Sequence, residues 1–561
     1  MKRILIVVLV VFSLLLSSCD LIPGVEGGGT GNENSGNNTK PDNNNGSGNG
    51  NSSDSSDSEN NGGNGDSGDS DDSDGGDDSG NGGTKCDGSL HTDSDNDGTC
   101  DGCYVSVLIE LDFFVINDLH GKFTDGANQP GIDELTTYLK NAYETEENVF
   151  LLSSGDMWQG GSESNLTKGI ILTDWMNELD FISMTLGNHE FDWGEEHIEN
   201  NAELAEFPIL AINVFDRATN SRVSYADASV VIEKSGVKIG IIGAIGDCYS
   251  SISSDKVTDV YFKTGSELTA LVKAESERLR ADGVDIIVYS LHDGYGYSGG
   301  FSISDNRLSS YYDPSLSKDG YVDIVFEGHT HQNYVLRDSY GVYHFQNGGE
   351  NKGIAHAEIM FNIANEKHSL SAYEIVSSAT YSKLEPDPLI AELLEKYADE
   401  IAVGNEVLGY NSSYRDDSEL EQLVADLYLE VGLETWGDDY NIFLGGGFLR
   451  TRSPYNLAAG EVKYSDLQML FPFENQIVLC SIKGSDLKSK FLETDDDDYY
   501  VSKSSYGNSI SSINASATYY VVVDTYTANY EYNNLTIIEY YDTTTFASHL
   551  LAEYVKSGGL A

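Results

Sequence analysis

The segment Asn188-His189-Glu190-Phe191-Asp192 brings three kinds of reactive group together within five residues. The amide oxygen of Asn188 can bind a metal ion, the imidazole of His189 can transfer a proton near neutral pH, and the carboxylate of Asp192 can orient that imidazole. The segment follows an apolar run at 181–186, which predicts a buried strand. Because α/β proteins place reactive groups at the ends of buried strands, we expect a reactive site here.

Four other predicted strands end in residue types that bind divalent metal ions. The segments are DLHG at 118–121, GDMWQG at 155–160, LHDG at 291–294 and GHTH at 328–331. Side chains two residues apart share one face of an extended segment. This applies to Asp118 with His120 and to His329 with His331, although the second pair could also flank a turn. With the Asn188 amide included, the candidate ligands are Asp118, His120, Asp156, Asn188, His292, His329 and His331.

This set of oxygens and imidazoles suits two divalent ions a few ångströms apart, with the Asp156 carboxylate between them. The same donors fit Mn, Fe, Zn or Co, so the sequence does not distinguish these metals. The five histidines without neighbours of this kind receive no functional role: His197, His344, His356, His368 and His549.

Predicted strands and helices alternate along the chain, and they must position these residues. Apolar runs predict strands over 105–116, 149–153, 181–186, 208–215, 237–245, 284–290 and 321–326, and helical spacing is found over 131–143, 168–178 and 266–282. Such alternation predicts an α/β fold in which strand ends share one edge of a sheet.

The motifs DLHG, GDMWQG, GNHEFDWG, LHDG and GHTH stand in the order found in the calcineurin-like metallophosphoesterases, and the chain from about residue 106 onward resembles their 5'-nucleotidase branch. The resemblance implies a four-layer α-β-β-α sandwich followed by a C-terminal α+β substrate domain. It assigns one metal ion to Asp118, His120, Asp156 and His331, a second to Asp156, Asn188, His292 and His329, and the catalytic dyad to His189 and Asp192.

The reaction that this resemblance implies is hydrolysis of nucleotide phosphate esters in nucleotide scavenging. A hydroxide held between two cations attacks phosphorus, and protonated His189 stabilises the transition state or protonates the leaving oxygen. One alternative keeps the chemistry but acts on cyclic nucleotides, sugar nucleotides or another diester. A second alternative is a non-catalytic surface binding protein on the same scaffold, and the intact ligand set argues against it.

The C-terminal half is separated by a Pro-Asp-Pro break and a predicted linker helix over 389–401. The family elements GG-I-R and PFGN match Gly446–Arg450 and 472–475, so the resemblance implies that Arg450 contacts phosphate and Phe473 stacks on the base, with Asn475 and Tyr526 as further contacts. The late GGDGY element and the Asn before the glycines are missing, and Tyr530 or Tyr532 could substitute for Tyr526. Without the resemblance, Phe473 would be a core residue and Arg450 a surface charge.

The first 19 residues have the features of a bacterial lipoprotein signal. A basic start precedes an apolar run at 4–16 and then Leu16-Ser17-Ser18-Cys19, in which Cys19 would be lipidated. A plain secretory signal is the alternative. Residues 20–84 are almost entirely Gly, Asn, Ser and Asp, which predicts a disordered stalk. We therefore expect an extracytoplasmic protein, anchored to a membrane through lipid, at the cell surface or in the periplasm.

Residues 85–104 form a separate cysteine- and aspartate-rich module. Asp93, Asp95 and Asp97 followed by Gly98 resemble a calcium loop, although Tyr104 replaces its usual closing Glu. The zinc alternative uses Cys86, His91, Cys100 and Cys103. One disulfide with a spare thiol, or plain acidic linker, are the remaining options, and calcium is the favoured one.

Chain length and net charge limit the number of domains and the class of binding partner. The 561 residues suffice for two or three cores, and we expect a catalytic domain over 105–383, a linker over 384–402 and a substrate domain over 403–561. Lys and Arg number 32 against 92 Asp and Glu, a formal charge of -60, which argues against a groove for a nucleic-acid duplex. We expect a nucleotide or another small phosphate ester as the partner.

Overall fold

The structure is a computed structural model that describes residues 91–103, 106–124, 130–295, 311–452, 455–494, 498–505, 507, 513–529 and 534–561. The predicted signal, Cys19, the stalk and Cys86 lie outside these residues. Among the described residues, no helix has both the length and the apolar character needed to cross a bilayer.

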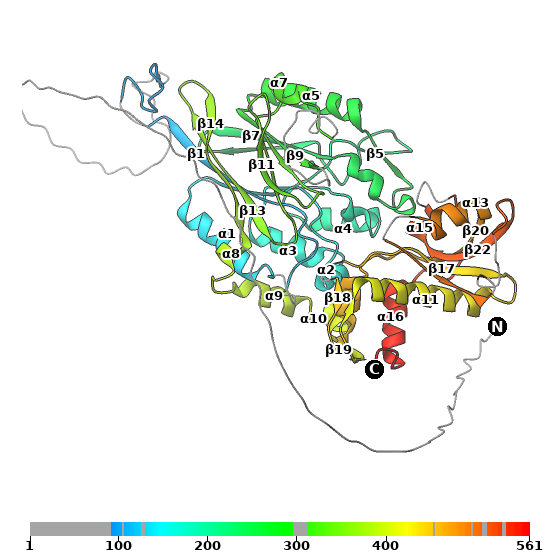
Figure 1. Cartoon of the computed structure of the whole chain (residues 1–561). Helices are drawn as coiled ribbons and strands as arrows, with labels where there is room; N and C mark the ends of the chain where they lie inside the picture. Colours follow the sequence, from blue (N-terminus) through cyan, green and yellow to red (C-terminus); the bar gives the residue numbers. More distant parts are fainter. Residues whose placement is uncertain are drawn as a thin grey trace, which may run out of the picture. The chain divides into compact units, whose positions relative to one another are not determined.

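Two six-stranded sheets form the first half of the structure (Figure 1). The first has the order β14-β13-β1-β2-β3-β4 and the second the order β11-β12-β10-β9-β7-β6. The strands of the first sheet are β1 (Leu108–Ile116), β2 (Val149–Ser153), β3 (Ser183–Thr185), β4 (Ile209–Leu210), β13 (Gly353–Asn362) and β14 (Lys367–Ser377). Those of the second are β6 (Ser229–Lys234), β7 (Val237–Ile245), β9 (Ile286–His292), β10 (Ile324–Glu327), β11 (Asn333–Arg337) and β12 (Tyr343–Asn347).

Strand β1 shows why the two sheets stack between helices. Alternate side chains of a strand point to opposite faces. Phe113 and Val115 enter the core between the sheets, whereas Phe114 and Ile116 enter the core shared with the helices. All four are almost fully buried. A strand that is apolar on both faces therefore requires a covered sheet, and the expected four-layer α-β-β-α arrangement is confirmed.

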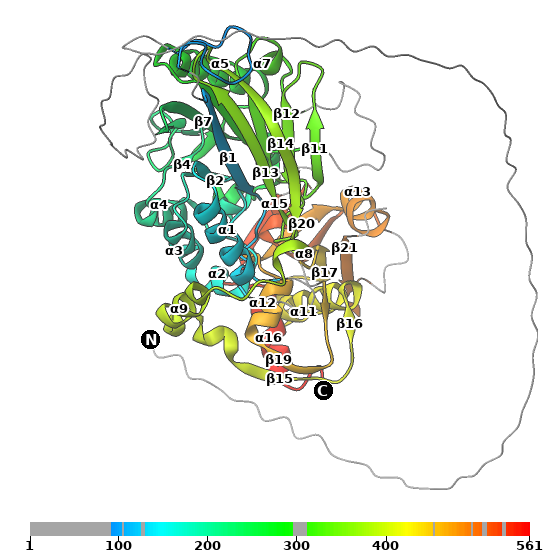
Figure 2. The same ribbon diagram turned by 90° about the vertical axis from the view of Figure 1, so that its left-hand side faces the viewer.

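Helices cover the outer face of each sheet. On the first sheet they are α1 (Asp133–Thr145), α2 (Ser162–Thr167), α3 (Ile170–Glu178), α4 (Glu195–Leu204) and α9 (Pro388–Lys396), several of which can be followed in Figure 2. On the second they are α5 (Gly265–Ala281) and α7 (Ser315–Lys318). The short elements are β5 (Val214–Asp216), β8 (Val260–Phe262), α8 (Ser378–Tyr381) and α10 (Ala398–Ile401).

Three expected elements differ from the observed ones. The helix expected over 168–178 is α3 and begins two residues later, because Lys168 and Gly169 both have left-handed backbone and separate it from the preceding α2. The strand expected over 208–215 is divided between β4 and β5, which belong to different sheets. The linker helix expected over 389–401 begins at Pro388, where the Asp387 side chain accepts from the Leu389 amide, and is interrupted at Tyr397.

The C-terminal half contains a five-stranded sheet of order β21-β17-β22-β20-β23. Its strands are β17 (Ile442–Phe448), β20 (Ile477–Lys483), β21 (Tyr499–Lys503), β22 (Thr518–Asp524) and β23 (Thr536–Tyr540). Its helices are α11 (Asp417–Trp436), α12 (Tyr464–Leu470), α13 (Gly484–Leu487), α15 (Thr525–Asn529) and α16 (Ala547–Lys556), and two small ladders pair β15 (Val407–Asn411) with β19 (Gly460–Lys463) and β16 (Arg415–Asp416) with β18 (Asn456–Leu457). The expected α+β fold of this half is confirmed.

Candidate active site

Four ligand-bearing loops follow β1, β2, β3 and β10, and the fifth ligand segment begins with His292 at the end of β9. These segments meet because the strands run parallel within each sheet. Strands β1, β2 and β3 pair in parallel, as do β9 and β10. Parallel strands place their carboxyl ends at the same edge. The side chains from the two sheets then face one another across that edge.

Asp156 lies at the centre of this group. Its Oδ2 atom is 3.0 Å from His292 Nε2 and 3.9 Å from His120 Nε2. Its Oδ1 atom accepts a hydrogen bond of 2.8 Å from the His189 amide. The Oδ2 atom is buried and has no hydrogen-bond partner among the described residues. A buried carboxylate oxygen with neighbours on two sides fits a ligand placed between two cations.

The other expected ligands fall into two clusters beside Asp156. In one, His331 Nε2 is 2.9 Å from His120 Nε2 and 3.4 Å from Asp118 Oδ1. In the other, the Asn188 Oδ1 atom is 2.9 Å from His329 Nδ1 and 3.3 Å from His292 Nε2. The seven side chains therefore lie together, and their division between two metal ions stays a prediction.

Backbone carbonyls orient two of the imidazoles. His120 Nδ1 lies 3.1 Å from the Gln159 carbonyl oxygen, and His292 Nδ1 lies 2.7 Å from the Ser154 carbonyl oxygen. A proton on each Nδ1 atom leaves the Nε2 lone pair directed at the centre of the site, which is the arrangement that metal-binding histidines adopt. The residues present thus fit a pair of divalent cations.

The backbone at the ligands is not extended, contrary to the expectation for Asp118 and His120, whereas His329 and His331 follow the alternative of a turn. Five of the seven ligands have left-handed backbone, a conformation that costs a non-glycine residue about 1–3 kcal/mol. Their φ values are 51° at Asp118 and His120, 54° at Asp156, 70° at His329 and 51° at His331. A tight turn can direct both side chains of a pair toward the centre of the site.

Close approach explains the glycine in the GD and GN motifs. A Cβ atom at Gly155 would lie 2.5 Å from His292 Nδ1, and one at Gly187 would lie 2.3 Å from Asp156 Oδ1. Gly155 also has a φ of 94°. Any larger residue at either position would push a candidate ligand out of place.

Burial and mutual charge set the protonation of the ligands. Burial lowers the pKa of His329 to about 4 and also lowers that of His120, so both imidazoles are neutral. Burial opposes ionisation of Asp118 and Asp156, but facing histidines lower the pKa of both. Burial likewise disfavours charge on His292, yet Asp156 raises its pKa to about 10. Neutral imidazole and ionised carboxylate are the forms that bind metal ions, and a cation would take the place of the His292 proton.

His189 and Asp192 form the expected pair. His189 begins a short 3₁₀ helix, His189–Phe191, and its Nδ1 atom is 2.8 Å from Asp192 Oδ2. Burial opposes protonation of His189, but Asp192 and Asp156 outweigh it and raise its pKa. The Nε2 atom accepts a hydrogen bond of 2.6 Å from Arg452 Nη2. The ring is thus held by a carboxylate on one side and by a guanidinium on the other.

Arg452 was not predicted from the sequence, where the matched motif ends at Arg450. The side chain of Arg450 is half exposed, and its Nε atom is 4.0 Å from Asp498 Oδ2. The Arg452 guanidinium carbon is 5.2 Å from the centre of the Phe473 ring. The only sequence signal for Arg452 is its position two residues after Arg450.

Glu190 is a second residue that sequence reasoning missed. Its fully buried carboxylate accepts backbone hydrogen bonds from Gly187 at 2.7 Å, Asp156 at 2.9 Å, Met157 at 2.8 Å and Trp158 at 3.3 Å. Burial and the nearby Asp156 raise its pKa to about 7. The side chain therefore joins the loops that follow β2 and β3, and its presence inside GNHEFDWG was the available signal.

The four expected substrate contacts line the same pocket as the candidate catalytic residues. The pocket has a volume of about 370 Å³. From the first half its lining includes Asp156, Asn188, His189, Asp192, His329 and His331, and from the C-terminal half it includes Phe448, Arg450, Arg452, Phe473, Asn475 and Tyr526. The Phe473 and His189 ring centres are 5.9 Å apart, and those of Phe448 and Tyr526 are 5.6 Å apart. Aromatic rings and arginines thus adjoin the metal-ligand cluster.

Asp93, Asp95 and Asp97 lie outside this pocket, in the loop before β1. The Asp93 carboxylate accepts from the amides of Asp97 at 3.0 Å and Gly98 at 3.1 Å, and Asp97 Oδ1 accepts from the Thr99 amide at 2.8 Å. These bonds shape the loop, and calcium binding by the three aspartates stays a prediction.

Comparisons with known proteins match both halves of the chain. Residues 111–333 match the model of the calcineurin-like phosphoesterases, and residues 400–534 match that of the 5'-nucleotidase C-terminal domain. An apyrase from Tabanus yao is 27% identical over 414 residues, covering 67% of this chain and 72% of that protein. Protein UshA from Yersinia enterocolitica is 25% identical over 418 residues, covering 66% of this chain and 72% of that protein.

A solved structure supports the same arrangement of domains. The crystal structure of a 5'-nucleotidase precursor from Thermus thermophilus has a TM-score of 0.60 at 19% identity and covers 80% of this chain and 96% of that one. At this identity the likeness concerns the fold. All candidate ligands and the dyad lie within the first matched segment, and the pocket arginines and aromatic residues from the C-terminal half lie within the second.

Proposed function

The chain belongs to the calcineurin-like phosphoesterases and carries a 5'-nucleotidase C-terminal domain, and we propose that it hydrolyses phosphate esters of nucleotides in the pocket described above. The observation that carries this proposal is that one pocket is lined both by four of the candidate metal ligands with the dyad and by arginines and aromatic rings. A phosphate would meet the first group, and a nucleobase would meet the second.

The seven candidate ligands would hold two divalent cations, divided between them as the family resemblance implies. When bound, such cations neutralise charge on phosphoryl oxygens and lower the pKa of a coordinated water, which is the chemistry that phosphate-ester hydrolysis needs. The buried Oδ2 atom of Asp156 supports a place between the two sets.

His189 is placed to transfer a proton to the leaving oxygen. With Nδ1 bonded to Asp192, the Nε2 atom is the one that faces the pocket. Nε2 can carry that proton only when Arg452 no longer donates to it, and Asp192 and Asp156 favour its uptake because they raise the pKa of His189. A substrate phosphate would compete with His189 for the Arg452 guanidinium, so Arg452 would pass from holding the imidazole to holding the phosphate.

At the other end of the pocket, Phe473 and Tyr526 offer rings for stacking on a base, and Asn475 offers an amide that can hydrogen-bond to it. Arg450, half exposed at the pocket, adds a second positive charge near the phosphates. These roles follow from chemistry and placement, and they favour a nucleotide over a simple phosphate ester.

The test is hydrolysis of AMP, ADP, UDP-glucose, 2',3'-cAMP and bis-p-nitrophenyl phosphate, each assayed with Mn, Fe, Zn and Co in turn. Released phosphate measures cleavage of AMP and ADP, and formation of the monoester product measures cleavage of the other three. We expect the highest kcat/KM with a nucleoside mono- or diphosphate. Preferred cleavage of 2',3'-cAMP, UDP-glucose or the bis-ester would instead support a phosphodiesterase. Bound metal and bound nucleotide with no turnover would support a non-catalytic binding protein.

A His189→Ala variant tests the proposed proton transfer. Loss of a general acid typically slows turnover about 10²–10⁴-fold. We expect a decrease of that size in kcat with metal content unchanged, measured by elemental analysis of the same sample. Turnover near that of the wild type would exclude His189 from the chemistry.

We also propose an extracytoplasmic location with a lipid on Cys19. The proposal is supported by the basic, apolar and small-residue order of the first 19 residues. A long polar segment at 20–84 would then hold the folded part away from the bilayer.

A further inference from the structure

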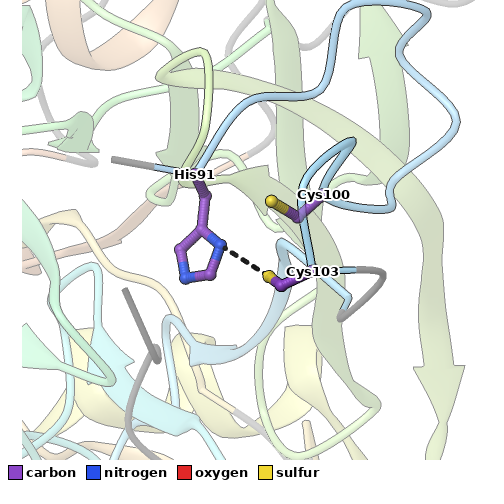
Figure 3. A group of neighbouring side chains, drawn as sticks. All are labelled: His91, Cys100 and Cys103. Carbon is purple, nitrogen blue, oxygen red and sulfur yellow. Dashed lines mark hydrogen bonds between the residues drawn. The ribbon is translucent and has the colours of Figure 1, made fainter. Parts of the chain in front are cut away.

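We propose that His91, Cys100 and Cys103 form a second metal site, separate from the phosphoesterase centre, that binds one zinc ion. The three residues lie in the loop before β1, and Figure 3 shows their ligating groups gathered in one place. Neither matched family segment includes this loop, because the first begins at residue 111.

The spacing of the ligating atoms fits tetrahedral zinc. The three atoms lie within 4.8 Å of one another, and His91 Nδ1 is 3.4 Å from Cys103 Sγ. Zinc binds thiolate sulfur at about 2.3 Å and imidazole nitrogen at about 2.0–2.1 Å, so two such ligands at a tetrahedral angle are about 3.6 Å apart. The observed separation therefore needs almost no adjustment. Cys100 and Cys103 also have the C-x₂-C spacing that is typical of zinc sites.

The loop is held in shape by bonds that do not involve these three side chains. The Asp101 amide donates to the Thr92 carbonyl oxygen at 2.7 Å, and the Asp93 carboxylate accepts from the Asn362 side chain at 2.7 Å. Asn362 ends β13, so this contact ties the loop to the first sheet. Cys100 is almost fully buried, and His91 is also buried. A site that is buried and shaped by its own loop loses little entropy on binding an ion.

Zinc suits these donors better than calcium does. Calcium binds oxygen ligands, whereas thiolate and imidazole select zinc and related ions. The Asp93 carboxylate already accepts two backbone amides and the Asn362 amide, so a calcium ion would share it with those three donors.

The position of the loop implies a structural role for this ion. The loop precedes the amino end of β1, whereas Asp118 follows its carboxyl end. A nine-residue strand spans about 30 Å, so the two metal centres lie at opposite ends of β1. Zinc at this distance would hold the loop against the sheet and would take no part in hydrolysis.

The test uses the full-length protein, a Cys100→Ser/Cys103→Ser double variant and an Asp95→Asn control in the same exposed loop. X-ray absorption at the zinc edge should show sulfur at about 2.3 Å in the wild type and the control. In the double variant we expect loss of this sulfur signal and of one equivalent of zinc, with phosphate release unchanged. Unchanged hydrolysis separates failure of this site from failure of the proposed function.

Two results would overturn the zinc site. One is a peptide map that joins Cys100 and Cys103 by a disulfide in protein prepared without oxidant, with no sulfur at zinc. The other is a sulfur signal that persists in the double variant. If the double variant does not fold, the absorption spectrum of cobalt-substituted wild-type protein provides the test. Absence of a thiolate-to-cobalt absorption band would also exclude the site.

Discussion

Arg452 extends from the C-terminal half of the chain to His189, 263 residues away in sequence. Its Nη2 atom is 2.6 Å from His189 Nε2, and its guanidinium lies against the Phe473 ring. Arg450, two residues earlier, is half exposed and lies 4.0 Å from the Asp498 carboxylate. At the scale of the single residue, the structure therefore brings Arg452 to His189, although the sequence motif had indicated Arg450.

An Arg452→Gln variant should lose affinity for phosphate. A charge-assisted hydrogen bond contributes about 1.5–3 kcal/mol, which corresponds to a rise in KM of about 10–100-fold for a nucleotide. Arg450→Gln is the matched control, and for an exposed charge we expect a change of less than about 5-fold. Steady-state kinetics with AMP measures both. A larger effect of Arg450→Gln would reverse the assignment.

At the scale of the element, Glu190 fastens two loops of the site through four backbone amides. A Gln in its place turns an NH₂ group toward some of these donors and leaves them without an acceptor. Each such loss costs about 1–3 kcal/mol, so we expect Glu190→Gln to lower the free energy of unfolding by at least that amount. Bound metal should decrease too, because the loops carry Asp156 and Asn188.

Glu196→Gln provides the comparison for this variant. Glu196 is exposed in the first turn of α4, and surface substitutions usually change stability by less than about 0.5 kcal/mol. Urea unfolding and elemental analysis of both variants make the measurement. Equal stability of the two variants would show that Glu190 does not hold the loops.

His344, near the amino end of β12, contacts the carboxyl ends of two other strands of the second sheet. It lies on β12, with Nδ1 2.7 Å from Glu327 Oε1 at the end of β10 and Nε2 3.7 Å from Asp338 Oδ2 just after β11. Burial opposes its protonation, but the two carboxylates outweigh burial and raise its pKa to about 9. The residue was given no role from the sequence, where its carboxylate neighbours are not apparent.

The raised pKa of His344 predicts how stability depends on pH. The unfolded-state pKa is about 6.5, so the stabilisation is complete below that pH and is lost as the pH rises through about 9. We expect the free energy of unfolding to fall between these values in the wild type. In His344→Gln the fall should be shallower, because that side chain does not titrate. Equal pH slopes for the two proteins, from urea unfolding at several pH values, would contradict this.

At the scale of the whole molecule, the pocket depends on contacts between the two halves. Ser162 Oγ donates to Gln468 Oε1 at 2.9 Å, and Lys168 Nζ is 2.5 Å from Glu474 Oε1. Asp156 and Phe473 line the same cavity only because these halves meet. Residues that would bind the base and residues that would bind the metals thus come from separate cores.

A Cys19→Ala variant tests the proposed anchor at this scale. Without a lipid on Cys19, the protein should move from the membrane fraction to the soluble fraction while phosphate release stays unchanged. Ser18→Ala keeps the cysteine and should remain with the membrane. Fractionation and an activity assay of each fraction make the measurement. Membrane attachment of Cys19→Ala would rule out this anchor.

Local spacing was enough to predict which side chains would cluster at the candidate metal site. Asp118, Asp156, Asn188, His292 and His329 each follow an apolar run, and parallel strands necessarily end at a common edge. Alternation likewise predicted the mixed α/β class, motif order indicated the phosphoesterase family, and the resemblance to that family implied the four layers. Periodicity and short motifs carry this information because they depend on neighbours within a few residues.

Only the tertiary structure decided the rest. The left-handed turns at Asp118 and His120 replaced an expected extended segment, and Arg452, Glu190 and His344 acquired partners that no local pattern indicates. These contacts join residues distant in the chain, so they depend on how sheets and halves pack. Packing is a property of the whole fold, because each such contact forms only after the elements on both sides are in place.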